Sequence, residues 1–223
     1  MKLCTVSPKC TSPNGPKPQS IANAQHILDF LATCTHDFVL LPGACENTPA
    51  LEDIQRVLVP GVHVFVESSE KSINKMQVQP CVVSKNSLLQ LPKQQFAQNP
   101  SQTQVLTLGA TLTNRTVQIA ERQVTFILCG EINGFNKYGL LKHGSTPTMD
   151  IIAHPTHTPM GRWNVLGAKL AALSQSGTVL YAANNDKRPN ISTDVRIYQN
   201  GQRLPLAKNS AANGQISWME CEA

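Results

Sequence analysis

Polar and reactive residues follow four apolar runs of the sequence. They occupy the short segments 42–46, 129–133, 154–157 and 184–187. In open α/β sheets, functional groups collect just beyond the carboxyl ends of strands, where the backbone meets solvent and loops can vary. The position of these four segments after apolar runs therefore predicts that the functional site is formed by residues within them.

Cys129 is the best candidate for a nucleophile among the seven cysteines. It follows the most apolar run, 124–128, and precedes Gly130, which permits close backbone approach, and then the acid Glu131. A thiolate is the nucleophilic form of cysteine, and an ammonium ion nearby favours it. The alternative interpretation is that Cys129 is a small buried hydrophobe, the commoner role for a cysteine at the end of a strand.

His154 and His157 suggest two further chemistries. The first is a metal pair, and the second is a base for Cys129 in a Cys/His dyad. We expect no metal, because a site needs three or four ligands and the same loop offers no third His, Cys or carboxylate. Most loop histidines are solvated or hydrogen-bonded to backbone, which is the alternative to the dyad.

Hydrophobic periodicity predicts the elements that position these residues. Helical spacing indicates helices over 21–31, capped by Ser20, over 51–59, and from Pro159, capped by Thr158, until Gly177. Continuous apolar runs predict buried strands at 38–41, 62–66, 124–128, 150–153 and 178–183. Short β-prone pieces at 78–84, 87–91, 105–108 and 116–119 indicate an antiparallel meander, and strands at 193–198 and 215–219, joined through Asn200 and Gly201, predict a closing hairpin.

The order of these elements, without an internal repeat or a linker, predicts one α/β domain over residues 1–223, with a mixed sheet or two sheets in layers. The 223 residues are 41% apolar, enough to bury a core, and 15% charged, against about 25% in a typical domain. Because the net charge of +5 is spread without blocks, no nucleic-acid partner is expected. No apolar run approaches the roughly 20 residues of a membrane span, and scattered cysteines without a CxxC pair are typical of reduced thiols in a cytoplasmic protein.

The order of these segments resembles the carbon–nitrogen hydrolase (nitrilase) superfamily along nearly the whole chain. FILCGE at 126–131 is similar to the family segment that carries the nucleophilic cysteine with an acid two positions on, and LPKQQF at 91–96 is similar to the turn of its catalytic lysine, here Lys93. The later family segments are matched in order by 150–155, Trp163 and 181–184. The resemblance implies a four-layer α-β-β-α sandwich with mixed sheets.

The resemblance also implies an activity and the residues that perform it. Cys129 would attack a small amide and form a thioester, and Lys93, or failing it Lys85, would stabilise the oxyanion, without a cofactor. The expected binding residues are Glu131, Asn133, His154 and His157, with Glu131 orienting the loop or accepting hydrogen bonds from backbone amides. The resemblance implies a homo-oligomer as well, since related proteins commonly pair through their helical layer.

The sequence departs from the family at the general base. Family members carry a catalytic Glu directly after the proline of the strand that matches 38–41, and Gly43 stands in that place here. Glu46, in the same loop, is the candidate replacement, with a solvated loop acid as the alternative interpretation. A second family Glu is absent after Lys93, where glutamines stand. Two other functions therefore stay open: a catalytically impaired protein of this fold that binds a ligand or partner, and acyl transfer to an amine.

Overall fold

The structure is a computed structural model that describes residues 1–8, 17–43, 48–71, 76–156, 163–183, 194–205, 209–211 and 216–223. In these residues the first sheet has the strand order β12 (Asn209–Ala211), β13 (Ile216–Glu222), β1 (Lys2–Pro8), β2 (Phe38–Leu40), β3 (His63–Lys71), β4 (Met76–Ser84) and β5 (Leu88–Gln90). Strands β1, β2 and β3 run parallel to one another, and the other neighbouring pairs are antiparallel.

The second sheet has a similar mixed construction. Its order is β11 (Gln202–Arg203), β10 (Asp194–Gln199), β9 (Thr178–Ala183), β8 (Ile151–Thr156), β7 (Arg122–Phe126) and β6 (Thr116–Ile119). Strands β7, β8 and β9 are parallel, and antiparallel strands flank them on both sides. Each sheet therefore has a parallel centre, whose strands are buried on both faces.

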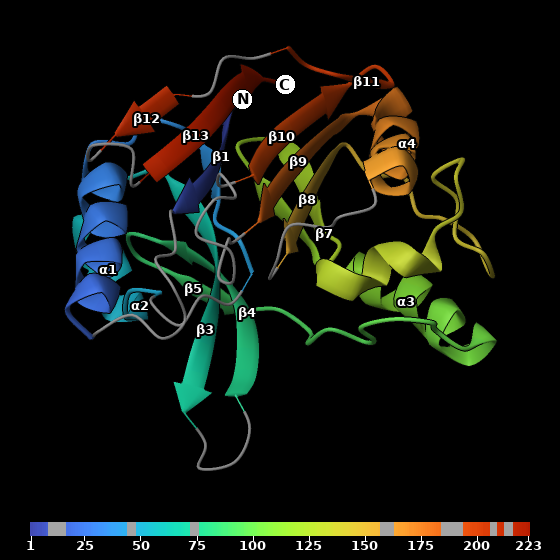
Figure 1. The fold of residues 1–223 in the computed structure, drawn as a ribbon, viewed down its shortest axis with the longest axis horizontal. Coiled ribbons are helices and arrows are strands. Elements are labelled where there is room, and N and C mark those ends of the chain that lie inside the picture. The colour runs from blue at the N-terminus through green and yellow to red at the C-terminus, as the bar shows by residue number, and fades with distance from the viewer. Residues whose placement is uncertain are drawn as a thin grey trace.

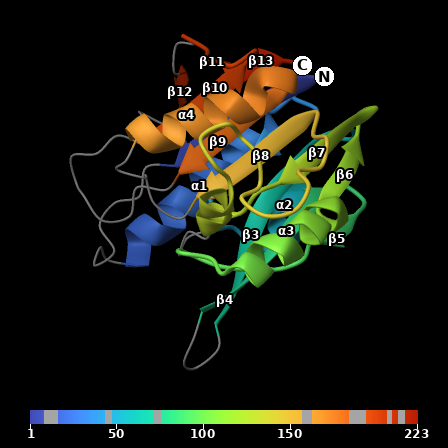
Figure 2. The ribbon, with the colours of Figure 1, turned by 90° about the vertical axis from the view of Figure 1, so that its right-hand side faces the viewer.

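The helices cover the two outer faces of this pair of sheets. Buried residues of α1 (Lys17–Ala32) and α2 (Leu51–Val57) pack on the first sheet, and those of α3 (Gln102–Asn114) and α4 (Trp163–Leu173) pack on the second. Figure 1 shows the resulting layers, with α1 and α2 on the left and α3 and α4 on the right, and Figure 2 looks onto the side covered by α3 and α4. The expected α-β-β-α sandwich is confirmed.

The core between the sheets fixes how the two sheets lie against each other. Phe65 of β3 stacks on Phe126 of β7, with ring centroids 5.0 Å apart and an interplanar angle of 22°. At one edge of the sandwich the backbone N–H of Gly43, just past β2, donates to the carbonyl of Thr156 at the end of β8, at 3.2 Å. The carboxyl ends of the parallel strands in both sheets therefore meet at the same edge.

The secondary structure differs from the predictions at four points. Helix α1 begins at Lys17, so Ser20 lies inside the helix and is not its N-cap residue. Residues 105–108 are not a strand but part of α3, where Val105, Leu108 and Leu112 are buried at helical spacing behind a capping box formed by Ser101 and Gln104. The strand β1 was not expected. Because β1 is present, β13 pairs with it in the first sheet, and the turn at 200–201 joins β10 to β11 instead.

No helix in the described part of the chain has both the length and the apolar character that crossing a bilayer requires.

Candidate active site

Cys129 lies where the chain leaves the second sheet. After β7, residues Ile127 and Leu128 continue in the buried core, and the Ile127 N–H donates to the Ala153 carbonyl of β8 at 3.0 Å. The 3₁₀ helix η1 (Cys129–Gly134) then begins, and Cys129 is partly exposed. A thiol in this position combines a rigid support with access to solvent.

Gly130 allows a second loop to lie directly on the Cys129 turn. A Cβ at position 130 would come within 1.9 Å of the carbonyl oxygen of Ala97 and 2.4 Å of its carbonyl carbon. Real Cβ atoms do not approach backbone so closely, so any other residue would push the 92–98 loop away. Because residue 130 is a glycine, the loop 92–98, which carries Lys93 and is hereafter the Lys93 loop, packs directly against the turn at Cys129.

Gly130→Ala is expected to lower the free energy of unfolding by about 3 kcal/mol, because the new methyl group meets backbone, which cannot rotate away as a side chain can. Gly109→Ala is the matched control, since its Cβ has no neighbour closer than 3.4 Å and lies within α3. There the substitution should stabilise by about 0.5–1 kcal/mol. Urea unfolding of both variants tests the pair, and equal changes would contradict the contact.

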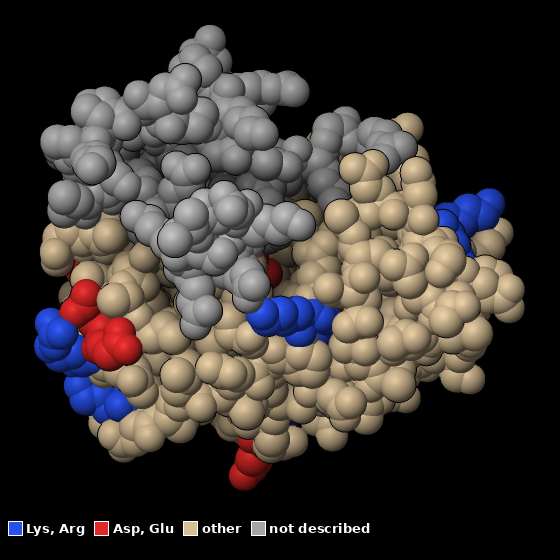
Figure 3. Space-filling view, turned by 90° about the horizontal axis from the view of Figure 1, so that it is seen from below, with Lys and Arg blue, Asp and Glu red and all other residues tan. Residues whose placement is uncertain are grey.

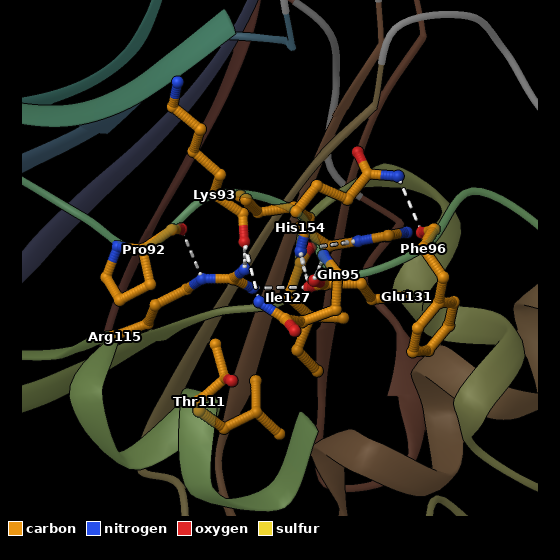
Figure 4. A network of polar contacts seen from close by, with 12 residues as sticks. Pro92, Lys93, Gln95, Phe96, Thr111, Arg115, Ile127, Glu131 and His154 are labelled. Atoms are coloured by element: carbon orange, nitrogen blue, oxygen red, sulfur yellow. Dashed lines mark hydrogen bonds and ion pairs between the residues drawn. The ribbon is translucent and has the colours of Figure 1, made fainter. Parts of the chain in front are cut away.

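A buried ion pair joins the Lys93 loop to the Cys129 turn. The side chains of Arg115 and Glu131 are fully buried, and Nη1 of Arg115 lies 2.5 Å from Oε2 of Glu131. Arg115 also donates from Nε to the carbonyl of Pro92 at 2.7 Å and from Nη2 to the carbonyl of Lys93. Figure 4 shows the arginine between the two segments, with its guanidinium directed at both.

Glu131 completes the connection by accepting two backbone hydrogen bonds. Its Oε1 accepts from the Gln95 N–H at 2.7 Å, and its Oε2 accepts from the Leu128 N–H at 3.0 Å. Burial raises the pKa of the Glu131 carboxyl, and the Arg115 guanidinium and the two N–H donors act in the opposite direction. Since both oxygens are engaged by this network, we assign Glu131 a positioning role.

Lys93 is held by its main chain and extends its side chain. Its carbonyl is fixed by Arg115, whereas the residue is largely exposed. In Figure 4 the side chain points away from the Arg115–Glu131 network. Lys85 lies elsewhere, because its ammonium group donates to the carbonyl of Arg56 in α2, at 2.6 Å. Of the two lysines considered, Lys93 is therefore the one on a loop in contact with the Cys129 turn.

His154 is enclosed in the layer between the second sheet and its helices. It is fully buried, its Nδ1 lies 2.6 Å from the Ile127 carbonyl, and its ring centroid is 5.7 Å from that of Tyr181. Burial lowers the pKa of His154 to about 4, so the ring is neutral near pH 7. The contact with a carbonyl assigns the proton to Nδ1, and among the described residues Nε2 has no hydrogen-bond partner.

The lowered pKa of His154 predicts a loss of stability in acid. Between pH 6.5 and about 4 the unfolded chain binds a proton at this ring that the folded chain does not, so stability falls as the pH falls through this window. His154→Asn retains an N–H donor without the titration. The free energy of unfolding of the unsubstituted protein should therefore fall by about 3 kcal/mol more than that of the variant between pH 7 and pH 4. The exposed His143, as His143→Asn, is the control, and parallel curves for the unsubstituted protein and His154→Asn would contradict the prediction.

The remaining expected site residues differ in what the structure says of them. The Asn133 side chain donates to the Ala97 carbonyl at 3.5 Å, so it lies against the Lys93 loop. Glu46 and His157 lie outside the described residues, as does the segment 184–187. Within the described ranges, no three His, Cys, Asp or Glu side chains are grouped so as to hold a metal ion. Uncharged residues make up most of the described surface on the face in Figure 3.

Arg115 is the residue of this network that the sequence did not indicate. It stands between a helix and a strand in the polar run TNRT, which has the appearance of a solvated turn. The available signal was indirect: an acid that follows a buried strand so closely needs a cation if it is itself buried.

Solved structures of other proteins have a similar architecture over nearly the whole length of this chain. A CN-hydrolase superfamily protein from Xanthomonas campestris, whose structure has an arsenic adduct in its active site, superposes with a TM-score of 0.64 at 12% identity, over 100% of this chain and 91% of that chain. An amidase from Nesterenkonia sp. gives a TM-score of 0.62 at 11% identity, over 99% and 90%. A glutamine-dependent NAD(+) synthetase from Cytophaga hutchinsonii gives 0.61 at 12%, over 99% of this chain and 42% of that chain.

Comparison of the sequence alone gives no such result. No protein-family model matches the chain, and no curated protein matches it. The likeness to the solved structures therefore shows the fold, which is that of the nitrilase superfamily.

Proposed function

We propose that this chain, which has the nitrilase-superfamily fold, hydrolyses the carbon–nitrogen bond of a small amide through a thioester on Cys129. The observation that carries the proposal is the network in which Arg115 and Glu131 join the Lys93 loop to the Cys129 turn. The buried ion pair holds the main chains of the two segments that carry the nucleophile and the lysine in a fixed relation, and acyl transfer requires such a fixed arrangement of its reacting groups. The superposed amidases support the reaction class.

Each residue has a defined part in this reaction. The Cys129 sulfur attacks the amide carbon, giving up its proton, and the Lys93 ammonium stabilises the negative charge that develops on the amide oxygen. The C–N bond then breaks and the nitrogen leaves with a proton. Water attacks the thioester carbon, the C–S bond breaks, and the carboxylic acid and the thiol are released. Arg115 and Glu131 position the two segments and touch no reacting atom.

A second candidate function is binding without catalysis. It is favoured by Gly43, which stands where family members carry a catalytic Glu. A protein of this kind would hold an amide in the same place but would form no thioester. Acyl transfer to an amine is the third candidate, and it differs from hydrolysis only in what intercepts the thioester.

Adduct formation and turnover separate these functions. Fluoroacetamide is a suitable probe, because its acetamide moiety adds covalently to the active-site cysteine in a variant of the Nesterenkonia amidase. We expect intact-mass and peptide analysis to find the adduct on Cys129, and ammonia release from a panel of short aliphatic amides. Neither adduct nor ammonia would favour the binding protein, and faster hydroxamate formation than hydrolysis in the presence of hydroxylamine would favour acyl transfer.

Cys34 provides a demanding control for this assignment. Its Sγ lies 3.2 Å from Nδ1 of His36, whose Nε2 lies 2.7 Å from Glu220, and the three residues line a cavity of about 420 Å³. Burial raises the pKa of the Cys34 thiol, and the negative end of the α1 dipole, two residues before it, also disfavours a thiolate. Cys34→Ala should therefore leave both the adduct and the turnover unchanged.

A further inference from the structure

Glu67 is a buried acid of β3 that faces the interior of the sandwich. Only 2% of its surface is exposed. Val64 and Val66 pack towards α1 and α2, whereas Phe65 packs in the core between the sheets. Because side chains alternate along a strand, Glu67 lies on the same inner face as Phe65. A carboxylate in such a place is costly for stability compared with an apolar residue, so its presence calls for an explanation.

Strand register places Glu67 beside the start of the Lys93 loop. Glu67 is paired with Pro80 across β3 and β4, and the Pro80 carbonyl accepts a hydrogen bond from the Leu91 N–H at 2.8 Å. Directly opposed residues in antiparallel strands share a face, and Leu91 is indeed part of the core between the sheets. Glu67, Pro80 and Leu91 therefore form one row across the sheet, and Lys93 follows Leu91 by two residues.

The stacked aromatic rings show that Glu67 and Cys129 lie at similar positions along the direction of the strands. Phe65 stacks on Phe126 across the two sheets. Glu67 comes two residues after Phe65 and Cys129 three after Phe126, and both strands run towards the edge at which the sheets meet. At about 3.3 Å per residue the two positions differ little in height, and facing sheets are about 10 Å apart. Two side chains and a small substrate between them span such a distance.

We propose that Glu67 is the proton-transferring carboxylate of the Cys129 site. Strand β3 would thus supply the carboxylate that the resemblance places after β2, where this chain has Gly43. The inference rests on the proposed thioester chemistry. As the S–C bond forms, the carboxylate accepts the Cys129 proton, and it delivers this proton to the nitrogen as the C–N bond breaks. In the second half it accepts a proton from water as the O–C bond forms and returns it to the sulfur as the C–S bond breaks. Protons balance over the cycle, and no further reactant is needed.

Glu67→Gln tests the role, because the amide has the shape of the carboxyl group but accepts no proton at neutral pH. With p-nitrophenyl acetate, whose leaving group needs no proton, acetylation of Cys129 should become slower but still occur, because Glu67 no longer accepts the thiol proton. The acetyl-enzyme should live about a hundredfold longer or more. Ammonia release should fall by a similar factor with KM changed less than about threefold, and Glu67→Asp should be intermediate. Glu121→Gln, at an exposed acid, is the matched control.

The outcomes separate this inference from the proposed function. If the unsubstituted protein releases ammonia and a folded Glu67→Gln releases it equally fast, the inference is wrong and the proposed function stands. If the unsubstituted protein cleaves no amide but the variant lengthens the acetyl-enzyme lifetime, amide hydrolysis is wrong and the role of Glu67 stands. An unchanged acetyl-enzyme lifetime, or no acetylation of Cys129 at all, overturns the inference. Thermal unfolding confirms that the variant is folded in each case.

Discussion

Cys129→Ala is expected to reduce ammonia release from short amides at least about 10⁴-fold, because among the described residues of the site Cys129 alone offers a thiol to carry the acyl intermediate. The substitution should cost little stability, since Cys129 is partly exposed and the loss of its sulfur leaves no sealed cavity in the core. Residual turnover near that of the unsubstituted protein would rule out the thioester mechanism. Steady-state ammonia assays and thermal unfolding of the same preparation measure both quantities.

The other described cysteines allow this loss to be assigned to one thiol. Cys221 is also partly exposed, but burial raises its pKa to about 11. It lies on β13 of the first sheet, whereas Cys129 follows β7 of the second sheet. Cys221→Ala and Cys34→Ala should therefore keep full activity and full labelling by fluoroacetamide. A variant with both substitutions, in which Cys129 still takes up the probe, would give the same answer in one experiment.

Arg115→Met is expected to lower the free energy of unfolding by about 3–5 kcal/mol, the usual cost of leaving one partner of a buried ion pair without the other. Methionine retains much of the length and apolar contact of the arginine side chain, so the loss reports mainly on charge and hydrogen bonding. Three carbonyl or carboxylate groups, those of Pro92, Lys93 and Glu131, lose a donor together. Urea unfolding measures the change.

Two comparisons make the Arg115 result specific. Arg122→Met removes an exposed arginine and should change stability by less than about 0.5 kcal/mol. The double variant Arg115→Met/Glu131→Leu should be more stable than Arg115→Met alone, because it removes the buried carboxylate that has lost its partner. If Arg115→Met matched Arg122→Met, the ion pair would not be the connection that holds the Lys93 loop.

Much of the fold could be predicted because its parallel strands are buried on both faces. The runs at 38–41, 62–66, 124–128 and 178–183 are apolar apart from one histidine and two threonines, and they correspond to β2, β3, β7 and β9. The strand β1 escaped because KLCTVSP mixes polar and apolar residues, although six of its seven residues are buried. Its hydroxyl groups are satisfied across the sandwich, for example by the hydrogen bond from Thr5 to the Tyr181 carbonyl at 2.8 Å.

Only some residues of the candidate site could be predicted from the sequence, for a different reason. The sequence pointed to Cys129 and Lys93 on separate loops, and the structure brings these loops together through Gln95 and Glu131. Arg115 and Glu67 were not indicated because each stands in a polar stretch that has the composition of a surface segment. Their burial arises from contacts between elements far apart in the chain, which periodicity within one element does not report.

The anchoring of the 92–98 loop limits how this protein could be redesigned. Arg115 fixes its first two carbonyls, Glu131 fixes the Gln95 N–H in its middle, and Ala97 rests on Gly130 near its end. An insertion anywhere in the loop would break at least one of these anchors and shift the lysine. To admit bulkier molecules, it would be better to leave the 92–98 loop unchanged and to vary side chains that face it.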